Sequence, residues 1–361
     1  MRVLTVGGAM IDTIAIISSD RIERMAMENA DSSFLLLEEG RKIEAQEVST
    51  HCGGGGVNAA VSMSRLGLDV ATLIKLGQDQ RAETLLAALM AEGVSTRWAL
   101  RDGRAPTGAS VLISSHDRNA GVFTFRGANT LLEEKDLRDD AFTSDVVYVS
   151  NLSNKSAEMF PRIVETSKRN GAFVAVNPGL RQISAYWPTL ETLLPKIDVL
   201  TVNASEAGTI VPRLVSRAGE GGDRLDGDDL PRVAAKGLRG GGFEMSLSGF
   251  VKAVTGLGLS YMVITDGGGG AYVGTAEEIL YCPVLPCEIV GTAGAGDAFA
   301  STFTACLALG WSNDHALRAA TINAASVVGY VDTQTGLLRI GPLNAAMKKH
   351  AKALPVRRWK L

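Results

Sequence analysis

The chain has 361 residues, 46% of them hydrophobic and 21% charged, which is the balance of a globular protein and enough chain for one large α/β domain. A net charge of −3 gives no sign of a nucleic-acid or membrane partner, and no stretch is apolar for long enough to span a bilayer. Four scattered cysteines without a CxxC pair argue against a disulfide framework, and the N-terminus lacks a signal-peptide pattern. We therefore expect a cytoplasmic protein.

Short apolar runs alternate with helical patterns along most of the chain. The predicted strands are 3–10, 69–77, 145–152, 173–179, 198–203 and 261–268, and the clearest helices are 55–67, 81–94 and 157–171. Strands that alternate with helices are joined by right-handed crossovers, which make the strands parallel. The sequence thus predicts an α/β fold, with a mostly parallel central sheet and helices on both faces.

Two segments interrupt this alternation and have the pattern of antiparallel strands. Residues 33–50 predict two strands around a turn at Gly40, and residues 106–126 predict a hairpin that turns near 116–121. We expect the two segments to form a small β-sheet lid over the parallel sheet.

Two further segments differ in composition from the α/β domain, which we assign to residues 1–345. Residues 212–250 are rich in glycine and charge, which predicts a flexible insertion with one short helix around 230–237. Residues 346–361 form a basic tail, for which a solvated terminus is favoured over a nucleic-acid arm.

The stretch VGTAGAGDAFASTF places one carboxylate, Asp297, behind a loop with almost no side chains. A helix starting near Ala298 would leave free backbone N–H groups at its N-terminus, where its dipole favours an anion. Gly294, Ala295 and Gly296 let the backbone approach a phosphate closely. The spacing fits neither the dinucleotide fingerprint nor the phosphate loop GxxxxGK[ST]. The alternative is a glycine-rich turn in which Asp297 only caps the helix.

A carboxylate beside an anion-binding loop suits phosphoryl transfer to a hydroxyl group. That reaction needs stabilisation of the γ-phosphate charge and a base that accepts the hydroxyl proton. We therefore interpret Asp297 as the base and the amides of residues 294–296 as the groups that hold the transferring phosphate.

Other polar residues follow predicted strands or glycine clusters. Asn58 follows the glycines of CGGGGVNAA and can bind a polyhydroxylated ligand, or it lies in a flexible helix entry. Asp12 follows the first strand, at the edge where open α/β sheets bind ligands, or it is a turn residue. Asn203 and Glu206 can bind a hydrated Mg²⁺ or phosphates, or they form a capping box. The run VITDGGGGAYV, at 263–273, gives a nucleotide room or forms a simple hairpin.

The order of these motifs resembles that of the ribokinase-like, or PfkB, family of carbohydrate kinases. GGGGVNAAVSMSRLG resembles the first family signature, and VGTAGAGDAFAST resembles the second and more specific one. PTGASVLI, VNASEAG and ITDGGGGAYV match secondary landmarks between them, so that the resemblance covers residues 3 to about 340.

The resemblance implies a role for each candidate residue. The base would be Asp297 and the anion hole Gly294, Ala295 and Gly296; the substrate hydroxyls would be bound by Asp12, Gly55, Asn58 and Arg181; Asn203 and Glu206 would serve Mg²⁺ and phosphate; and Thr265, Gly267, Gly270 and Asn323 would bind the nucleotide. It also implies ATP as a cofactor, a lid that closes over the sugar and a homodimer formed through that lid.

The sequence departs from the family pattern at several positions. Gly291 replaces the aspartate that opens the second signature and helps many members bind a monovalent cation, which leaves K⁺ dependence open. Ala82 replaces a usual glycine, and Asn177 replaces an aspartate in a motif that keeps Arg181. These departures weaken the prediction of the substrate more than the prediction of a kinase reaction.

Three functions remain open at this point. The first is an ATP-dependent kinase that phosphorylates a hydroxyl of a small sugar. The second is a nucleoside kinase, in which Phe34, Phe123 or Phe125 on the lid would stack on the base. The third is a non-catalytic sensor that binds a nucleotide or a sugar.

Overall fold

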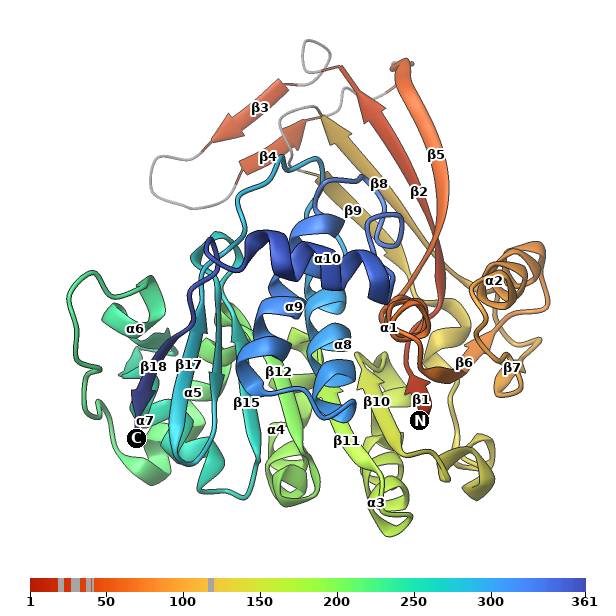
Figure 1. Cartoon of the computed structure of the whole chain (residues 1–361). Coiled ribbons are helices and arrows are strands. Elements are labelled where there is room, and N and C mark those ends of the chain that lie inside the picture. The colour runs from red at the N-terminus through yellow and green to blue at the C-terminus, as the bar shows by residue number, and fades with distance from the viewer. Residues whose placement is uncertain (19–22, 27–32, 37–39, 41, 116–119) are drawn as a thin grey trace.

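A ten-stranded central sheet organises the protein (Figure 1). The computed structural model describes residues 1–18, 23–26, 33–36, 40, 42–115 and 120–361. Across the sheet the strands are β18 (Arg357–Lys360), β17 (Glu278–Cys282), β16 (Ala271–Gly274), β15 (Tyr261–Thr265), β12 (Val199–Asn203), β11 (Phe173–Asn177), β10 (Val146–Ser150), β1 (Arg2–Val6), β6 (Asp69–Leu76) and β7 (Ala99–Arg101). The strands from β15 to β7 are parallel, and β16 to β18 are antiparallel.

Helices cover both faces of this sheet, which confirms the predicted fold class. One face carries α1 (Gly55–Arg65), α2 (Gln80–Ala91), α8 (Ala295–Ala308) and α9 (Asn313–Val327), with α10 (Ile340–His350) against α9; the other carries α3 (Phe160–Arg169), α4 (Leu180–Leu193), α5 (Ala204–Ala218) and α7 (Leu247–Thr255). Each face has its own apolar core. Because the central strands are buried on both sides, they are almost continuously apolar in sequence.

Short 3-10 helices lie between several of these elements. They span Gly127–Thr130 (η2), Glu134–Asp136 (η3), Asp139–Phe142 (η4), Asn154–Met159 (η5), Leu194–Lys196 (η6) and Gly267–Gly269 (η7). Among the described residues, none of the helices combines the length and apolar character that a bilayer crossing would need.

The lid is a four-stranded sheet that rises beyond the end of the central sheet (Figure 1). Its strand order is β5 (Ala45–Gly53), β2 (Met10–Ile17), β8 (Gly108–Ser115) and β9 (Ala120–Phe125). The segment 106–126 contributes the antiparallel pair β8 and β9, whose connection at 116–119 lies outside the described residues.

The prediction for residues 33–50 was wrong in its pairing. β4 (Ser33–Leu36) pairs with β3 (Glu23–Ala26), whereas β5 pairs with β2, so no hairpin forms around Gly40. The sequence also predicted one strand over 3–10, but β1 ends at Val6 and β2 begins at Met10. The glycines at 7 and 8 separate the two strands, and β2 then leaves the central sheet for the lid.

The glycine-rich segment 212–250 carries more regular structure than the predicted flexible insertion. α5 continues to Ala218, and α6 (Arg232–Lys236), β13 (Leu238–Gly240) and β14 (Phe243–Met245) precede α7. Arg232 forms an ion pair with Asp266, directly after β15. This ion pair anchors the segment to the end of β15.

The basic C-terminus is not the solvated tail that the sequence favoured. α10 continues to His350, and β18 pairs with β17 at the edge of the central sheet. Trp359 packs against the core and its Nε1 donates to the carbonyl oxygen of Asp226 at 2.9 Å. Arg358 in this strand forms ion pairs with both Glu278 and Asp314.

Candidate active site

Three adjoining cavities lie where the parallel strands end, between the sheet, the lid and the first turns of α1 and α8. The large cavity of about 360 Å³ and the middle cavity of about 300 Å³ share Thr265 and Gly296 in their walls. The lid cavity of about 190 Å³ lies under the lid sheet. The middle cavity is lined by polar residues at the ends of β10, β11, β12 and β15, because the carboxyl ends of parallel strands meet at one edge of the sheet.

Asp297 lies in the first turn of α8 and lines the middle cavity. The helix begins at Ala295, earlier than the predicted start near Ala298, because Gly294 caps it in a left-handed conformation with φ of 79°. A Cβ at Gly294 would lie 2.6 Å from Thr333, so only glycine fits there. The first bond of the helix runs from the Ala298 amide to the Gly294 carbonyl, which leaves the preceding amides available to an anion.

The carboxylate of Asp297 accepts a hydrogen bond of 2.9 Å from Nδ2 of Asn58. Burial raises the pKa of Asp297 above its usual value, the Asn58 hydrogen bond lowers it, and the charge of Asp12 raises it further. A carboxylate with a raised pKa is a better proton acceptor in its ionised form. Gly55 makes room beside it, because a Cβ there would lie 2.9 Å from Ser150 Oγ and 3.4 Å from an Asp297 oxygen.

Asn58 is buried, and most of its hydrogen-bonding capacity is used by protein groups, while its contact with substrate hydroxyls stays a prediction. Its Oδ1 accepts hydrogen bonds from Thr333 Oγ1 at 2.9 Å and Gln334 Nε2 at 3.0 Å, while Nδ2 donates to Asp297. Arg65 holds the same loop by donating to the Gln334 carbonyl at 2.6 Å. Three of the four hydrogen bonds that the amide can make are thus internal, and they orient Nδ2 toward Asp297.

Asp12 lies on β2 and lines the lid cavity. Its Oδ1 accepts a hydrogen bond of 2.5 Å from Ser110 Oγ. Burial raises the pKa of Asp12 more than the Ser110 hydrogen bond and the charge of His51 lower it. His51 and Asp332 also line this cavity, and its aliphatic and thioether side chains are Met10, Ile14, Leu112, Val122, Ala293 and Val331.

Asn203 and Glu206 form the capping box that the sequence left open. The Glu206 amide donates to Asn203 Oδ1 at 2.8 Å, and the Asn203 amide donates to Glu206 Oε2 at 2.9 Å. Both residues also line the middle cavity, where burial raises the pKa of Glu206. Across the described residues, no group of three or more His, Cys, Asp or Glu side chains is arranged to hold a metal.

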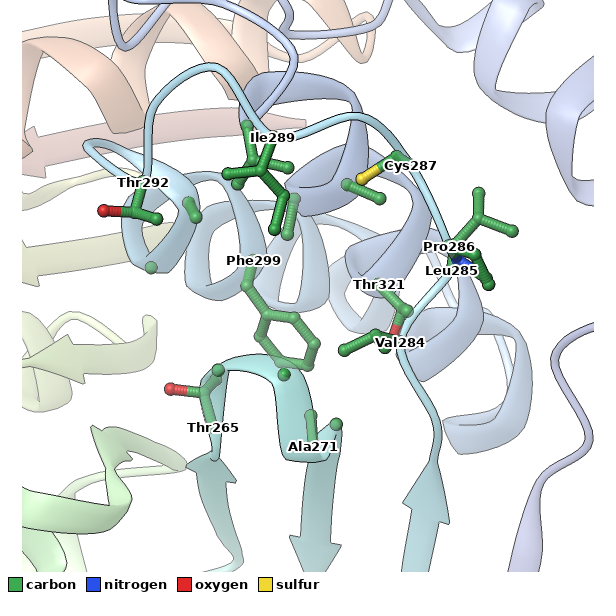
Figure 2. Close-up of a pocket in the computed structure, with 18 residues that line it drawn as sticks. Thr265, Ala271, Val284, Leu285, Pro286, Cys287, Ile289, Thr292, Phe299 and Thr321 are labelled. Carbon is green, nitrogen blue, oxygen red and sulfur yellow. The ribbon is translucent and has the colours of Figure 1, made fainter. Parts of the chain in front are cut away.

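The large cavity is mainly apolar (Figure 2). Thr265, Gly267 and Gly270, which the resemblance assigned to the nucleotide, line it, and β15 and β16 also form the simple hairpin that was the alternative. Phe299 points into the cavity, with Thr265 at one end and Ile289 at the other (Figure 2). Sequence reasoning missed the segment 284–289, whose apolar residues carry no motif.

Asn323 does not line the large cavity, contrary to the sequence prediction. Its Nδ2 donates to Thr302 Oγ1 at 2.7 Å and its Oδ1 accepts from the Leu338 amide at 2.8 Å. The residues of α9 that reach the cavity are Thr321, Ala324 and Ala325. Asn323 therefore fastens α9 to α8 and to the segment before α10.

Arg181 lies in the first turn of α4 with an exposed side chain. The residue that caps this helix, Gly179, lines the middle cavity. Arg181 itself is not among the residues that line the three cavities.

An open, mostly parallel sheet with a β-lid over a carboxylate and free helix amides is the architecture of ribokinase-like proteins. The family model for pfkB family carbohydrate kinases matches residues 14–224 and 244–339. The chain therefore belongs to the PfkB family of carbohydrate kinases.

Characterised relatives agree with this assignment. Deoxyribokinase from Salmonella typhi is 24% identical over 337 residues, which cover 92% of this chain and 97% of the relative. The bifunctional ribokinase/ribose-5-phosphate isomerase A from Fructilactobacillus sanfranciscensis is 24% identical over 302 residues, or 81% of this chain, but the chain spans only 50% of it. The solved structure of Arabidopsis thaliana ribokinase complexed with ribose and ATP has a TM-score of 0.71 at 19% identity, covering 96% of this chain and 98% of that one.

Proposed function

We propose that this carbohydrate kinase transfers the γ-phosphate of ATP to a hydroxyl of a small sugar, with Asp297 as the base. The observation that carries the proposal is the position of Asp297 at the N-terminus of α8, beside free amides and with a raised pKa. The residue lines the middle cavity, and Asn58 links it to Thr333 in the wall of the lid cavity. The acceptor in the lid cavity and the donor in the large cavity would meet at this carboxylate.

Each part of the site has a task in that reaction. Asp297 takes the proton of the attacking hydroxyl. The hydroxyl oxygen forms a bond to the γ-phosphorus, and the bond between the γ-phosphorus and the leaving oxygen of ADP breaks. The amides that precede the first bond of α8 hold the negative charge of the phosphoryl group in transfer. The large cavity, with its apolar walls and its glycines after β15, suits the base and ribose of ATP.

The middle cavity suits a divalent cation that keeps most of its water. Glu206 keeps carboxylate lone pairs beyond its capping bond and lines this cavity with Asn203. A hydrated Mg²⁺ takes few protein ligands and neutralises the charge of the phosphates, so these residues fit it. A cation would stabilise the ionised form of the partly buried Glu206, whose pKa burial raises.

The faces of β9 favour a sugar over a nucleoside. Val122 and Thr124 line the lid cavity, whereas Phe123 and Phe125 are 63% and 52% exposed on the opposite face. These two aromatic rings are therefore not placed to stack on a base, and the side chain of Phe34 lies outside the described residues. The small volume of the lid cavity suits a pentose or hexose.

The outer face of the lid suits a second copy of this chain. Val48, Val111, Phe123 and Phe125 lie on this face, and each is between 44% and 63% exposed. Val111 and Phe123 are directly paired across β8 and β9. A contiguous apolar face of this kind is covered when two lids pack against each other, so we infer a homodimer formed through the lid.

The proposal is tested by ADP release with Mg-ATP across a panel of pentoses, hexoses and nucleosides. Asp297→Asn is expected to lower turnover by roughly a hundredfold or more, as for a lost general base. Asp69→Asn, which changes an exposed aspartate, is the matched control.

A stability measurement excludes misfolding as the cause. A carboxyl whose folded pKa is raised contributes stability at low pH that is lost as pH rises through that folded pKa. At pH 8 the Asp297→Asn protein should therefore unfold in urea no earlier than the wild type. Unchanged turnover in this variant would contradict the role of Asp297.

A further inference from the structure

The turn between β15 and β16 forms part of the wall of the large cavity, but its own residues do little to fix its conformation. It contains four consecutive glycines, 267–270, and Gly267 and Gly270 have positive φ angles of 50° and 88°. Glycine loses more conformational freedom on ordering than any other residue, so this turn is costly to hold in one shape. The turn lies between Thr265 and Ala271 and faces the ring of Phe299 (Figure 2). Contacts from outside the turn therefore decide how well the cavity wall keeps its shape.

Asp266 connects the turn to the rest of the protein. Its amide donates to the Gly270 carbonyl at 2.8 Å, and its own carbonyl accepts from the Gly269 amide at 2.8 Å, so the backbone of the turn closes on this residue. Its carboxylate lies against the same backbone, because a Cβ at Gly269 would overlap with Oδ2 of Asp266. The position of this carboxylate and the path of the turn are thus linked.

Arg232 holds the carboxylate from a segment that is far away in the sequence. Its Nε donates to Oδ2 of Asp266 at 3.0 Å and its Nη2 donates to Oδ1, so the guanidinium binds both oxygens. Only 4% of the Asp266 side chain is exposed, and a carboxylate buried to this degree is unfavourable without a partner. Arg232 begins α6 and lies within residues 225–243, which separate the two parts of the chain that the family model matches. The ion pair therefore joins the nucleotide-side turn to a segment outside the family pattern.

The segment that carries Arg232 is itself fixed to the sheet. Val233, the next residue of α6, is fully buried in the apolar core. Two side chains of β18 hold the loop before α6: Arg357 Nη1 donates to the Asp229 carbonyl at 3.0 Å, and Trp359 Nε1 donates to the Asp226 carbonyl at 2.9 Å. The guanidinium of Arg232 thus extends toward Asp266 from a support that the edge strand of the central sheet holds in place.

We propose that Arg232 is a positioning residue for the nucleotide, acting through Asp266 on the turn at 267–270. This inference rests on the proposed function, because it takes ATP to bind in the large cavity, and it goes beyond it by giving a role to the segment 225–243. Gly267, Gly268 and Gly270 line the large cavity, whereas Arg232 and Asp266 do not, so the two charged residues act on the cavity wall and not on the nucleotide.

Calorimetric titration with Mg-ATP, without a sugar, measures the effect of Arg232. If the turn keeps its binding conformation only about a tenth of the time in Arg232→Gln, the Kd for ATP rises about 10-fold. Arg232→Lys keeps the charge and one hydrogen bond, so it should raise the Kd less. In turnover assays with saturating sugar, Arg232→Gln should raise the KM for ATP by the same factor and leave kcat and the KM for the sugar unchanged. Urea unfolding confirms that each variant is folded under the assay conditions.

Asp266→Ala separates positioning from a simple effect of charge. The loss of a carboxylate near the polyanionic ATP would tighten binding if only charge mattered, whereas positioning predicts a Kd raised as in Arg232→Gln. The Arg232→Gln/Asp266→Ala double variant should bind ATP no more weakly than the weaker single variant, because both residues act through one ion pair.

Arg239→Gln is the matched control, since it also removes one positive charge from the segment 225–243, where Arg239 is exposed and pairs with Glu244. The inference is overturned if Arg232→Gln binds ATP as tightly as the wild type, or if Asp266→Ala binds it more tightly. It is also overturned if Arg239→Gln raises the Kd as much as Arg232→Gln, because the charge of the segment would then act on ATP at a distance.

The same measurements separate this inference from the kinase proposal. Mg-ATP binding that weakens in both Arg232→Gln and Asp266→Ala, without turnover of any acceptor, would support the positioning role and contradict the kinase proposal. Sugar turnover that depends on Asp297, with a KM for ATP that is unchanged in Arg232→Gln, would do the opposite.

Discussion

Asn58→Ala tests whether Asn58 positions the base or binds the sugar. The substitution removes the hydrogen bond from Nδ2 to Asp297 and the two bonds that Thr333 and Gln334 donate to Oδ1. A hydrogen bond to a charged group contributes about 1.5–3 kcal/mol, which corresponds to about a 10- to 100-fold loss in kcat/KM. Thr333 and Gln334 are only partly buried and can bond water instead, so the free energy of unfolding should fall by only about 1–2 kcal/mol.

The diagnostic readout is kcat/KM as a function of pH. The lost hydrogen bond lowers the pKa of Asp297 in the wild type, so its removal raises that pKa and moves the acid limb to higher pH. Thr333→Val, which removes one bond to Asn58 but none to Asp297, is the matched control and should move the limb less. An unmoved acid limb together with a higher KM for the sugar would refute the reasoning, because Asn58 would then act on the substrate.

Two further predictions concern the lid and the large cavity. Phe123→Asp places a charge on the outer lid face and should convert a dimer into a monomer in light scattering, whereas Lys348→Asp on α10 should not; a wild type that is already monomeric would contradict the lid interface. Cys287 is exposed in the wall of the large cavity, so ATP should slow its alkylation several-fold, while alkylation of Cys52, outside that wall, should be unaffected. Equal alkylation of Cys287 with and without ATP would place the nucleotide elsewhere.

The sequence predicted the parts of the site that depend on local order along the chain. Asp297 lies three residues after Gly294, in the first turn of the helix that this glycine caps, and the first turn of any helix has unpaired backbone amides. Thr265, which the family resemblance assigned to the nucleotide, directly ends a strand and lines the large cavity, where the carboxyl edge of a parallel sheet binds ligands. The fold class followed in the same way from the alternation of strands and helices.

The contacts that the sequence did not indicate are those between distant segments. Asn58 meets Asp297 239 residues later, and its amide is occupied by a loop 275 and 276 residues away, which no local pattern indicates. Asn323 faces Thr302 because of how α9 packs on α8. The C-terminal strand was missed for the same reason, since an exposed basic segment becomes a strand only when an open sheet edge is beside it.

Side chains alternate between the two faces of a strand, and this alternation determines which residues of β9 face the lid cavity and which lie on the outer face of the lid. In the nucleoside-kinase alternative, the sequence offered Phe34, Phe123 or Phe125 for stacking on the base because they are aromatic and lie on the lid. In the structure Val122 and Thr124 face the cavity, so the rings of Phe123 and Phe125 lie on the outer face by necessity. Shifting the register of β9 by one residue would exchange the two faces and turn both rings toward the lid cavity. The pairing of β9 with β8 therefore determines the shape of the substrate cavity and the proposed dimer surface together.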